Sequence, residues 1–563
     1  MEYQVWAPSA GRVEVEVDGT PFAMTAAPGG WWHATAPAGQ SYGFRLDGAP
    51  ARPDPRSPRQ PDGPDGLSRT VDHGAFHWSD TPWHGRPLAG AIVYELHIGT
   101  FTPAGTFAGA EQHLDHLVAL GVDFVELMPV CPFPGTYGWG YDGVAPWAVH
   151  EPYGGPEGLK RFVDAAHRKG LGVILDVVHN HLGPSGNHLP AYGPYFTDRH
   201  HTPWGSAVNL DAPGSDEVRA YFRESALSWL RDYRIDGLRL DAVHALVDDR
   251  ALHFLEELAG AVDELSVAVN RPLFLVGESD LNAPRITDPR QAGGYGLTAQ
   301  WSDDFHHALH TAVTGESQGY YADFAEDPLA ALARVLTRGW FHDGTWSSFR
   351  ARHHGREFPL PYGHRLLGYA QTHDQIGNRA IGDRLTIPQL ALAVPLVLSS
   401  PFTPMLFMGE EWGASTPWAY FTDHTDPELA EAVRQGRRRE FAAMGWSEED
   451  VPDPQARATV LGSTLDWSEP RSGEHAELLA WYRDLIRLRK SSPDLTDPDL
   501  RRVRVEYDSA EGWLRLHRGR FQITVNFSDK PVDVAAGTPL LHWGSLSDTR
   551  LGARSCVITA SES

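Results

Sequence analysis

Cysteine is nearly absent from this chain, and long apolar runs are absent altogether. The two cysteines, Cys131 and Cys556, are too few for a disulfide framework, and no Cys-x-x-Cys metal motif occurs. A membrane-spanning helix requires roughly 20 consecutive apolar residues. The longest apolar stretch, which begins at Ile387, is interrupted by four prolines. We therefore expect no membrane span, no metal centre and no cofactor.

Basic residues are also scarce relative to acidic ones. The chain has 48 Lys and Arg against 73 Asp and Glu, a formal net charge of −25. A field of this sign repels nucleic acid and anionic membranes, so we expect neither as a partner. The charge serves solubility equally well and identifies no substrate. The first residues carry no basic and apolar leader, so a cytoplasmic location is the simplest expectation.

The two ends of the chain read as β structure. Residues 1–85 contain alternating segments, and one of them closes on Asp18-Gly19, a hairpin signal. We predict an N-terminal β-sandwich there that resembles a carbohydrate-binding module, and the sequence leaves open whether it binds glucan or only braces its neighbour. The proline-rich tract 51–66 is expected to run as an extended loop. Residues 496–563 alternate again and predict an antiparallel C-terminal β domain.

The region between them, residues 86–495, alternates short apolar strands with helices. Strands without polar alternation are buried on both faces and belong to a parallel sheet. Eight such units predict an α/β fold, a (β/α)8 TIM barrel with insertions. The eight strand candidates are AIVYELHIGTF from Ala91, DFVELMPV from Asp123, LGVILDVV from Leu171, GLRLDAV from Gly237, PLFLVGES from Pro272, GLTAQWSDDF from Gly296, HRLLGYAQTHD from His364 and TPMLFMGEE from Thr403.

Carboxylates stand at the ends of four of these strands: Asp176, Asp241, Glu278 and Asp374. A single acid after a strand is most often a helix cap. However, buried acids are costly unless paired or used, and the carboxyl ends of barrel strands converge on one pocket. Four of them in this arrangement favour a catalytic site.

The chemistry that fits paired carboxyl groups is cleavage of a glycosidic bond. One group protonates the leaving oxygen while the other attacks the sugar or activates water. Arg239 precedes Asp241 by two residues on the same strand face, and its charge would keep Asp241 ionised, as a nucleophile requires. Glu278 follows an apolar strand, a setting that can hold a carboxyl group protonated and so suits the acid.

Four short segments in this order, DVVHNH, GLRLDAVH, GES and THD, resemble the four motifs of the α-amylase family of glycoside hydrolases. The resemblance implies that Asp241 is the nucleophile, Glu278 the acid/base and Asp374 a third carboxylate that grips the sugar. It implies a retaining reaction through a glycosyl-enzyme ester. It also implies that further residues bind the same sugar or orient the group: Tyr141, Asp176, His181, Arg239 and His373.

One position departs from the family pattern. His179 stands where the first motif often carries Tyr. Many members bind calcium through the Asn of this motif and acids in the following loop. That loop has few clustered acids here, so we expect Asn180 to be a structural hydrogen-bonding residue and no metal to be bound.

Longer segments resemble those members of the family that release free trehalose from maltooligosyltrehalose. The segments are 177–196, 202–211, 300–310 and 370–385. The resemblance implies hydrolysis of the α-1,4 bond next to the terminal trehalose, and a pathway partner, maltooligosyltrehalose synthase, that builds this terminus. Acidic and aromatic residues at the last strands are expected to line the trehalose side, although each serves equally well as a loop or helix cap. They are Trp301, Asp303, Asp304, Glu410 and Glu411.

Two alternatives remain open. A glycogen branching enzyme shares the barrel and its acids but passes the glycosyl group to a sugar hydroxyl instead of water. The motifs do not separate the two, because both acceptors use one intermediate. The other alternative is a non-catalytic glucan-binding protein on an inactive barrel, which the intact set of Asp241, Glu278, Asp374 and Arg239 argues against.

Overall fold

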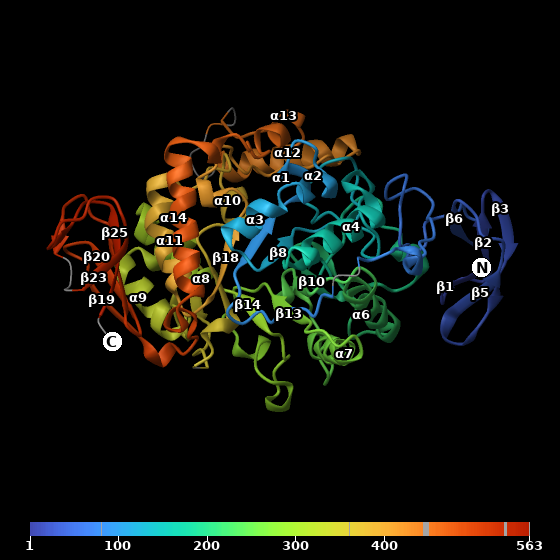
Figure 1. The fold of residues 1–563 in the computed structure, drawn as a ribbon. Coiled ribbons are helices and arrows are strands. Elements are labelled where there is room, and N and C mark those ends of the chain that lie inside the picture. The colour runs from blue at the N-terminus through green and yellow to red at the C-terminus, as the bar shows by residue number, and fades with distance from the viewer. Residues whose placement is uncertain (80–81, 360, 443–446, 448–449, 534–536, 562–563) are drawn as a thin grey trace.

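The computed structural model describes residues 1–79, 82–359, 361–442, 447, 450–533 and 537–561. Eight parallel strands close into a central barrel, and their order around the barrel is their order in the chain (Figure 1). All eight coincide with the predicted strands, which confirms the TIM barrel. They are β7 (Val93–Leu96), β8 (Phe124–Leu127), β9 (Gly172–Val177), β12 (Gly237–Leu240), β13 (Phe274–Gly277), β14 (Ala299–Trp301), β17 (Leu366–Tyr369) and β18 (Thr403–Phe407).

Helices cover the outside of the barrel. The main ones are α3 (Leu114–Leu120), α4 (Gly155–Arg168), α6 (Ser215–Asp232), α7 (Phe254–Ala268), α8 (Asp303–Thr314), α9 (Pro328–Arg338), α11 (Ile387–Ser399) and α14 (Gly473–Lys490). The described chain between β13 and β14 forms only two 3-10 turns, so the predicted alternation is incomplete there. The apolar run from Ile387 is a buried helix: Pro388 occupies its first turn, where a missing N–H costs nothing.

The N-terminal region is a sandwich of two three-stranded antiparallel sheets, as predicted. One contains β1 (Glu2–Trp6), β5 (Trp31–Thr35) and β4 (Thr25–Ala26), and the other β3 (Thr20–Ala23), β2 (Val13–Val17) and β6 (Tyr42–Leu46). Asp18 and Gly19 both have positive φ, 46° and 78°, as the predicted tight hairpin turn requires. The proline-rich tract lies against the barrel helices, where Tyr221 donates to the Pro55 carbonyl at 2.8 Å.

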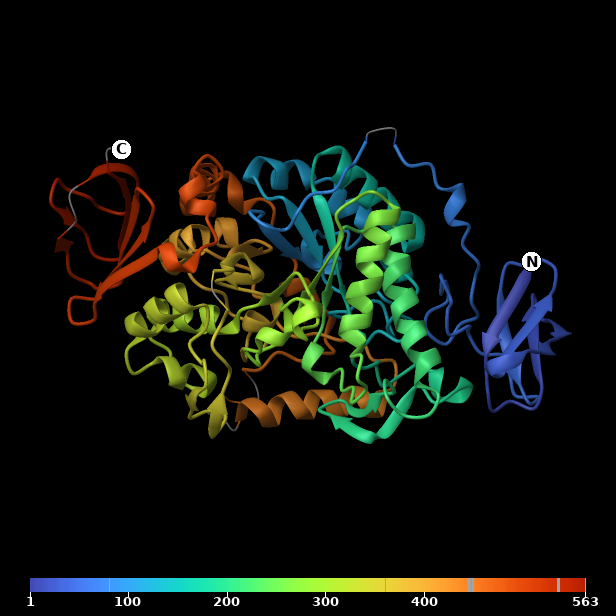
Figure 2. The same ribbon diagram turned by 90° about the horizontal axis from the view of Figure 1, so that it is seen from below.

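The C-terminal region is a five-stranded antiparallel sheet at the opposite end of the molecule from the sandwich (Figures 1 and 2). Its order is β19 (Val503–Asp508), β20 (Trp513–Arg518), β21 (Phe521–Asn526), β25 (Ser555–Ala560) and β23 (Thr538–Trp543). Among the described residues, no helix is both long and apolar enough to cross a membrane. Cys131 and Cys556 are buried free thiols.

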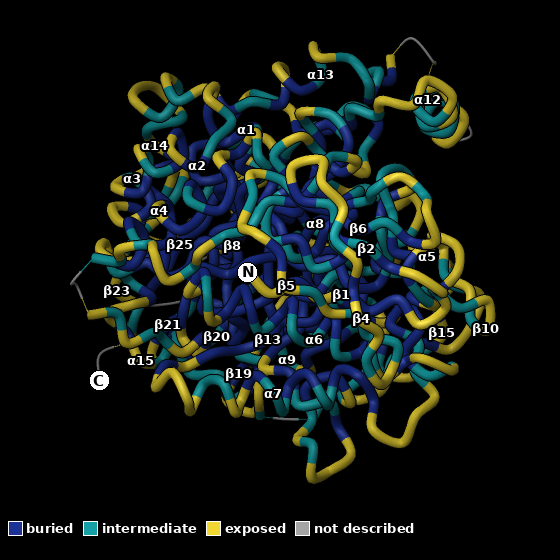
Figure 3. The backbone as a smooth tube through the Cα atoms, turned by 90° about the vertical axis from the view of Figure 1, so that its right-hand side faces the viewer, coloured by how far each residue is buried: buried dark blue, intermediate teal, exposed yellow. Residues whose placement is uncertain are grey.

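Three insertions follow the carboxyl ends of barrel strands. A hairpin of β10 (Phe196–Thr202) and β11 (Gly205–Val208) follows β9, the short helix α10 (His373–Gly377) follows β17, and α12 (Pro427–Ala442) follows β18. Figure 3 contrasts the buried barrel interior with the largely exposed α12 and β10. These insertions shape the entrance to the barrel.

Candidate active site

A cavity of about 730 Å³ opens at the carboxyl ends of the barrel strands. It brings together six predicted site residues: Tyr141, His181, Asp241, Glu278, His373 and Asp374. The rest of its wall comes from segments that follow β8, β9, β12 and β18, and the principal side chains there are Trp139, Asp142, Trp204, His244, Tyr420, Arg437 and Glu440. Asp176 and Arg239 do not line the cavity, because they are fully buried beneath it.

Arg239 lies at the centre of the buried layer. Its Nη1 donates to Asp176 Oδ2 and to Asp241 Oδ1, both at 2.8 Å. Asn180 donates from Nδ2 to the other Asp241 oxygen at 2.7 Å. The carboxylate of Asp241 is thus held by an arginine and an amide, and charge-assisted hydrogen bonds of this kind fix its direction. The predicted structural role of Asn180 agrees with this contact.

Glu278 is oriented by a left-handed residue just after the neighbouring strand β12. Ala242 has φ 38°, and its backbone N–H donates to Glu278 Oε2 at 2.5 Å. A non-glycine residue in this region is strained, and such strain is common at functional sites. Burial raises the pKa of Glu278 to about 8, the nearby charges of Asp241 and Asp374 add to this effect, and Arg239 opposes it. The carboxyl group therefore retains its proton at neutral pH.

His373, from the fourth motif, is bound from below by Glu95 of β7. The Nδ1 atom of His373 lies 2.5 Å from Glu95 Oε1, and its backbone N–H donates to Oε2 at 3.1 Å. Burial alone would lower the pKa of His373, but the charges of Glu95 and Asp374 outweigh it and raise this pKa to about 9. Glu95 was not predicted as a site residue, although an acid inside a fully buried strand was a signal that could have identified it.

Tyr141 completes a hydrogen-bonded chain across the pocket. His373 Nε2 lies 2.9 Å from the Tyr141 hydroxyl, which donates to Asp176 Oδ2 at 2.6 Å. The chain Glu95–His373–Tyr141–Asp176 continues through Arg239 to the nucleophile candidate. Six side chains from five different barrel strands or their loops are therefore coupled.

Two of the residues predicted for the trehalose side lie close to this network. The Trp301 ring packs 4.4 Å from the Arg239 guanidinium and forms part of the buried layer. Asp303 Oδ1 accepts from Tyr369 at 2.6 Å and from Gln375 Nε2 at 3.2 Å. Burial raises the pKa of Asp303 to about 7. Neither side chain is part of the cavity wall.

Asp304 and Glu410 are not brought to the cavity. Asp304 Oδ2 accepts from the backbone N–H groups of Phe341 and His342 at 2.8 and 2.9 Å. Glu410 accepts from the Phe407 N–H at 3.0 Å and from Tyr482 of α14 at 3.2 Å. Both carboxylates turn into the protein because buried backbone donors there need acceptors. Glu411 also points away and accepts from Tyr94 at 3.1 Å.

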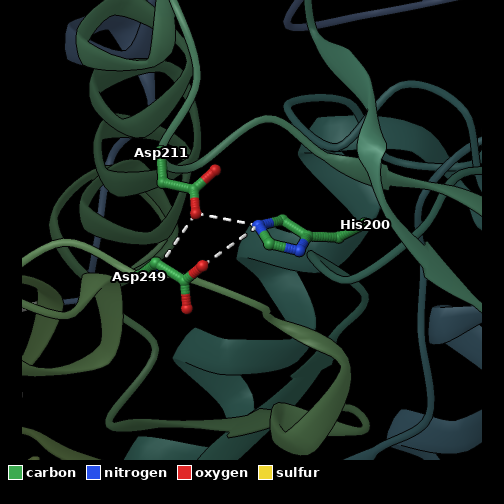
Figure 4. A group of neighbouring side chains, drawn as sticks. All are labelled: His200, Asp211 and Asp249. Carbon is green, nitrogen blue, oxygen red and sulfur yellow. Dashed lines mark hydrogen bonds and ion pairs between the residues drawn. The ribbon is translucent and has the colours of Figure 1, made fainter.

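One group of side chains outside the cavity has metal-ligand character: His200, Asp211 and Asp249 (Figure 4). His200 Nε2 lies 2.8 Å from Asp211 Oδ2 and 3.8 Å from Asp249 Oδ2. Arg199 approaches both acids, at 3.9 and 3.4 Å. Positive charge from the protein itself already balances these carboxylates, so we assign no metal to the group.

Comparison with known proteins places this arrangement in a family. Residues 64–190 match the family model described as the alpha amylase catalytic domain, and residues 498–558 match a domain of unknown function, DUF3459. A malto-oligosyltrehalose trehalohydrolase of Rhizobium sp. (strain M-11) is 55% identical over 556 residues, which cover 96% of this chain and 93% of the relative. The chain belongs to the malto-oligosyltrehalose trehalohydrolase family, within the alpha-amylase glycoside hydrolases.

Other relatives are consistent with membership of this family. The malto-oligosyltrehalose trehalohydrolase of Mycobacterium tuberculosis (strain ATCC 25618 / H37Rv) is 53% identical, over 97% of this chain and 96% of the relative. A crystal structure from Salmonella typhimurium superposes with a TM-score of 0.92 at 37% identity and covers 100% of this chain and 97% of that one. A 1,4-alpha-glucan branching enzyme of Xanthomonas campestris is more distant, at 27% identity over 74% of this chain and 61% of the relative.

Proposed function

We propose that this protein hydrolyses the α-1,4-glucosidic bond next to the terminal trehalose of maltooligosyltrehalose and releases trehalose and a maltooligosaccharide. The observation that carries the proposal is the pairing of a protonated Glu278 with an Asp241 held by Arg239 in one cavity. A glycosidase needs a proton donor and a second carboxyl group directed at the sugar, and these two residues fit those needs. The choice of trehalose as the product rests on the full-length relatives.

In the first step Glu278 gives its proton to the glycosidic oxygen as the bond from that oxygen to the anomeric carbon breaks. An Asp241 oxygen forms an ester with the anomeric carbon, and trehalose leaves. In the second step the Glu278 carboxylate takes a proton from water, the hydroxide attacks the anomeric carbon, and the ester bond to Asp241 breaks. Two inversions give net retention.

The other cavity residues have roles that follow from their contacts. Asp374 is half-exposed at the cavity wall and grips hydroxyl groups of the sugar that reacts. Tyr141, His181 and His373 bind the same sugar. Beneath them Asp176 and Arg239 fix the direction of Tyr141 and Asp241. The hydrogen-bonded layer is rigid, and rigid positioning of the reacting groups is a major source of rate enhancement.

On the trehalose side, Asp303 is the predicted residue that we retain. The support for Asp303 is that its Oδ1 accepts from Gln375, the residue after Asp374, at 3.2 Å. Trp301 supports Arg239 from below. Asp304 and Glu410 are not proposed as sugar-binding residues, because the buried groups described above occupy them.

The substrate also implies a partner and a setting. A maltooligosaccharide must first receive its trehalose terminus, so a maltooligosyltrehalose synthase precedes this enzyme in the pathway. The proposed compartment is the cytoplasm. The proposed domain boundaries are 1–85 for the sandwich, 86–495 for the barrel and 496–563 for the C-terminal β domain.

One experiment tests the function. The protein is incubated with maltotriosyltrehalose and, separately, with maltopentaose, and the products are separated by chromatography. We expect trehalose and maltotriose from the first substrate and much slower cleavage of the second. New α-1,6 linkages from a linear glucan would instead identify a branching enzyme. Binding of either sugar without any turnover would identify a non-catalytic glucan-binding protein.

A further inference from the structure

A glycine lies in the middle of α12 on the face that lines the active-site cavity. Gly436 is the tenth of sixteen residues in this helix, and a Cβ added to it would meet no atom within 4 Å. Glycine in a helix interior is unfavourable relative to alanine. Because the protein leaves the space open, packing within the chain does not explain the glycine. Glycine also serves where a backbone must approach a ligand closely, and this position faces the cavity.

The helix is fixed over the cavity by the next residue. The Arg437 guanidinium packs 5.2 Å from the Tyr420 ring and 4.6 Å from the Phe441 ring. Its Nη2 donates to the carbonyl of Gly377 at 2.9 Å, at the end of the short helix that carries Asp374. The position of Gly436 is therefore tied to the catalytic loop.

A flat aromatic surface lines the cavity from another insertion. Trp204 connects β10 and β11 and is 50% exposed, although it lies in the cavity wall. Its indole stacks on His181 with centroids 4.6 Å apart and planes inclined by 7°. In Figure 2 the orange helix α12 and the blue-green hairpin lie at the same edge of the molecule, and Figure 3 shows α12 above β10. The cavity lies between them.

We propose that the glucan chain of the substrate passes between Trp204 and Gly436, with one glucosyl ring stacked on the indole and the chain crossing α12 at the glycine. Sugar rings present a C–H face that packs on aromatic rings, as Trp204 offers. The proposal rests on the proposed function and assigns subsites to the maltooligosyl part of the substrate.

The contacts of Trp204 place it on the maltooligosyl side of the substrate rather than on the trehalose side. The leaving trehalose must lie next to Glu278, which protonates it. Trp204 instead stacks on His181, which is bonded to Asn180, the amide that holds Asp241. The ring that becomes attached to Asp241 belongs to the maltooligosyl part, so the chain continues from the Asp241 side.

The test compares substrates of two lengths, maltosyltrehalose and maltopentaosyltrehalose, and uses the ratio of their kcat/KM values, long over short. We expect Trp204→Ala and Gly436→Leu to lower this ratio about tenfold, the size of one lost stacking contact or one blocked subsite. Gly436→Ala should lower it less. Trp204→Phe should restore most of it, because the phenyl ring retains the flat face.

Two control variants should leave the ratio unchanged. Ala432→Leu adds the same side chain to an exposed position of α12 outside the cavity wall, and Trp346→Ala removes a 56% exposed tryptophan outside it. An unchanged ratio in Gly436→Leu or Trp204→Ala would overturn the proposal. An equal loss with both substrates would place these residues on the trehalose side and overturn it as well.

A binding measurement separates this proposal from the proposed function. Calorimetry with maltopentaose, on protein that carries Glu278→Gln, reports glucan binding without any reaction. Added Trp204→Ala should weaken that binding about tenfold. If the wild-type protein releases no trehalose but Trp204→Ala still weakens maltopentaose binding, the proposed function fails and the glucan path between Trp204 and Gly436 stands. If the wild-type protein releases trehalose but Trp204→Ala does not change maltopentaose binding, only the proposed glucan path fails.

Discussion

The carboxylate of Glu95 binds His373 with both oxygens, one to the imidazole Nδ1 at 2.5 Å and one to the backbone N–H at 3.1 Å. The histidine is thereby fixed in position and charge. Its other ring nitrogen faces the Tyr141 hydroxyl at 2.9 Å and Asp374 at 3.5 Å. A strand-buried acid of β7 thus governs two residues that face the substrate.

Replacing Glu95 with Gln should therefore change the charge of His373. The amide retains a hydrogen bond but not the negative charge, so burial then lowers the pKa of His373 from about 9. Groups on the neighbouring elements also act on this pKa: Asp374, Asp176, Glu126, Arg239 and His97. We expect kcat to fall about 10²-fold, and the alkaline limb of the pH profile of kcat to move to lower pH. Trehalose release between pH 5 and 10 measures both effects.

The matched control for that variant is Glu411→Gln. Glu411 is also buried and pairs with a histidine, His116, at 2.7 Å, but His116 does not line the cavity, whereas His373 does. It should leave the pH profile in place. If Glu95→Gln lowers kcat equally at every pH and neither limb of the profile moves, the proposed positioning role is contradicted.

The proton on Glu278 predicts the alkaline limb of the wild-type enzyme. The acid form is the active one, and the pKa is raised to about 8. The value of kcat/KM should therefore be constant just below this pH and fall as pH rises through about 8, since Glu278 then loses its proton. Asp303→Asn removes a neighbouring negative charge that raises this pKa. That variant should move the alkaline limb to lower pH. If the limb does not move, it does not report the titration of Glu278.

The two central carboxyl groups should each be indispensable for turnover. Glu278→Gln removes the transferable proton and Asp241→Asn the nucleophile, and we expect kcat to fall about 10²- to 10⁴-fold or more in each case. Binding of maltooligosaccharide, measured by calorimetry, should persist, because neither change removes the cavity. Near-normal trehalose release by either variant would refute the assigned roles.

Asp304 should matter for stability rather than for substrate choice. Asp304→Ala leaves the N–H groups of Phe341 and His342 and the amide of Asn282 without their acceptor. Unsatisfied buried donors cost about 1–3 kcal/mol each, and we expect a loss of about 3 kcal/mol in the free energy of unfolding after partial relaxation. Urea unfolding measures this loss. A changed preference between maltotriosyltrehalose and maltopentaose at unaltered stability would restore Asp304 to the sugar site.

The sequence was sufficient to predict the barrel, because strands that are buried on both faces have a recognisable pattern of apolar residues. Strands β7 to β18 are short apolar runs without alternation, and each was found where predicted. The convergence of Asp241, Glu278 and Asp374 followed from topology alone, since parallel strands that close into a barrel bring their carboxyl ends to one rim. Strand register and rim position require no knowledge of any single rotamer.

What the sequence did not decide was the direction of each side chain once the strand had ended. Asp303 and Asp304 are adjacent, yet one lies beside Gln375 and Tyr369 near the network and the other caps a buried loop. Glu410 follows a strand just as Glu278 does, but it turns outward to Tyr482. A difference of one residue in a turn decides whether a side chain points toward the site or into the surrounding protein. The local sequence pattern does not encode that difference.

The sequence by itself determined the family and the barrel, and it predicted which carboxyl groups react. Only the tertiary structure decided which residues lie beneath and around them: Glu95 beneath His373, Arg239 between Asp176 and Asp241, and Gly436 in the same cavity wall as Trp204. The physical reason is that charge state and ligand space depend on neighbours distant in the chain. Burial and contact across the barrel set them, and no spacing in the sequence records those contacts.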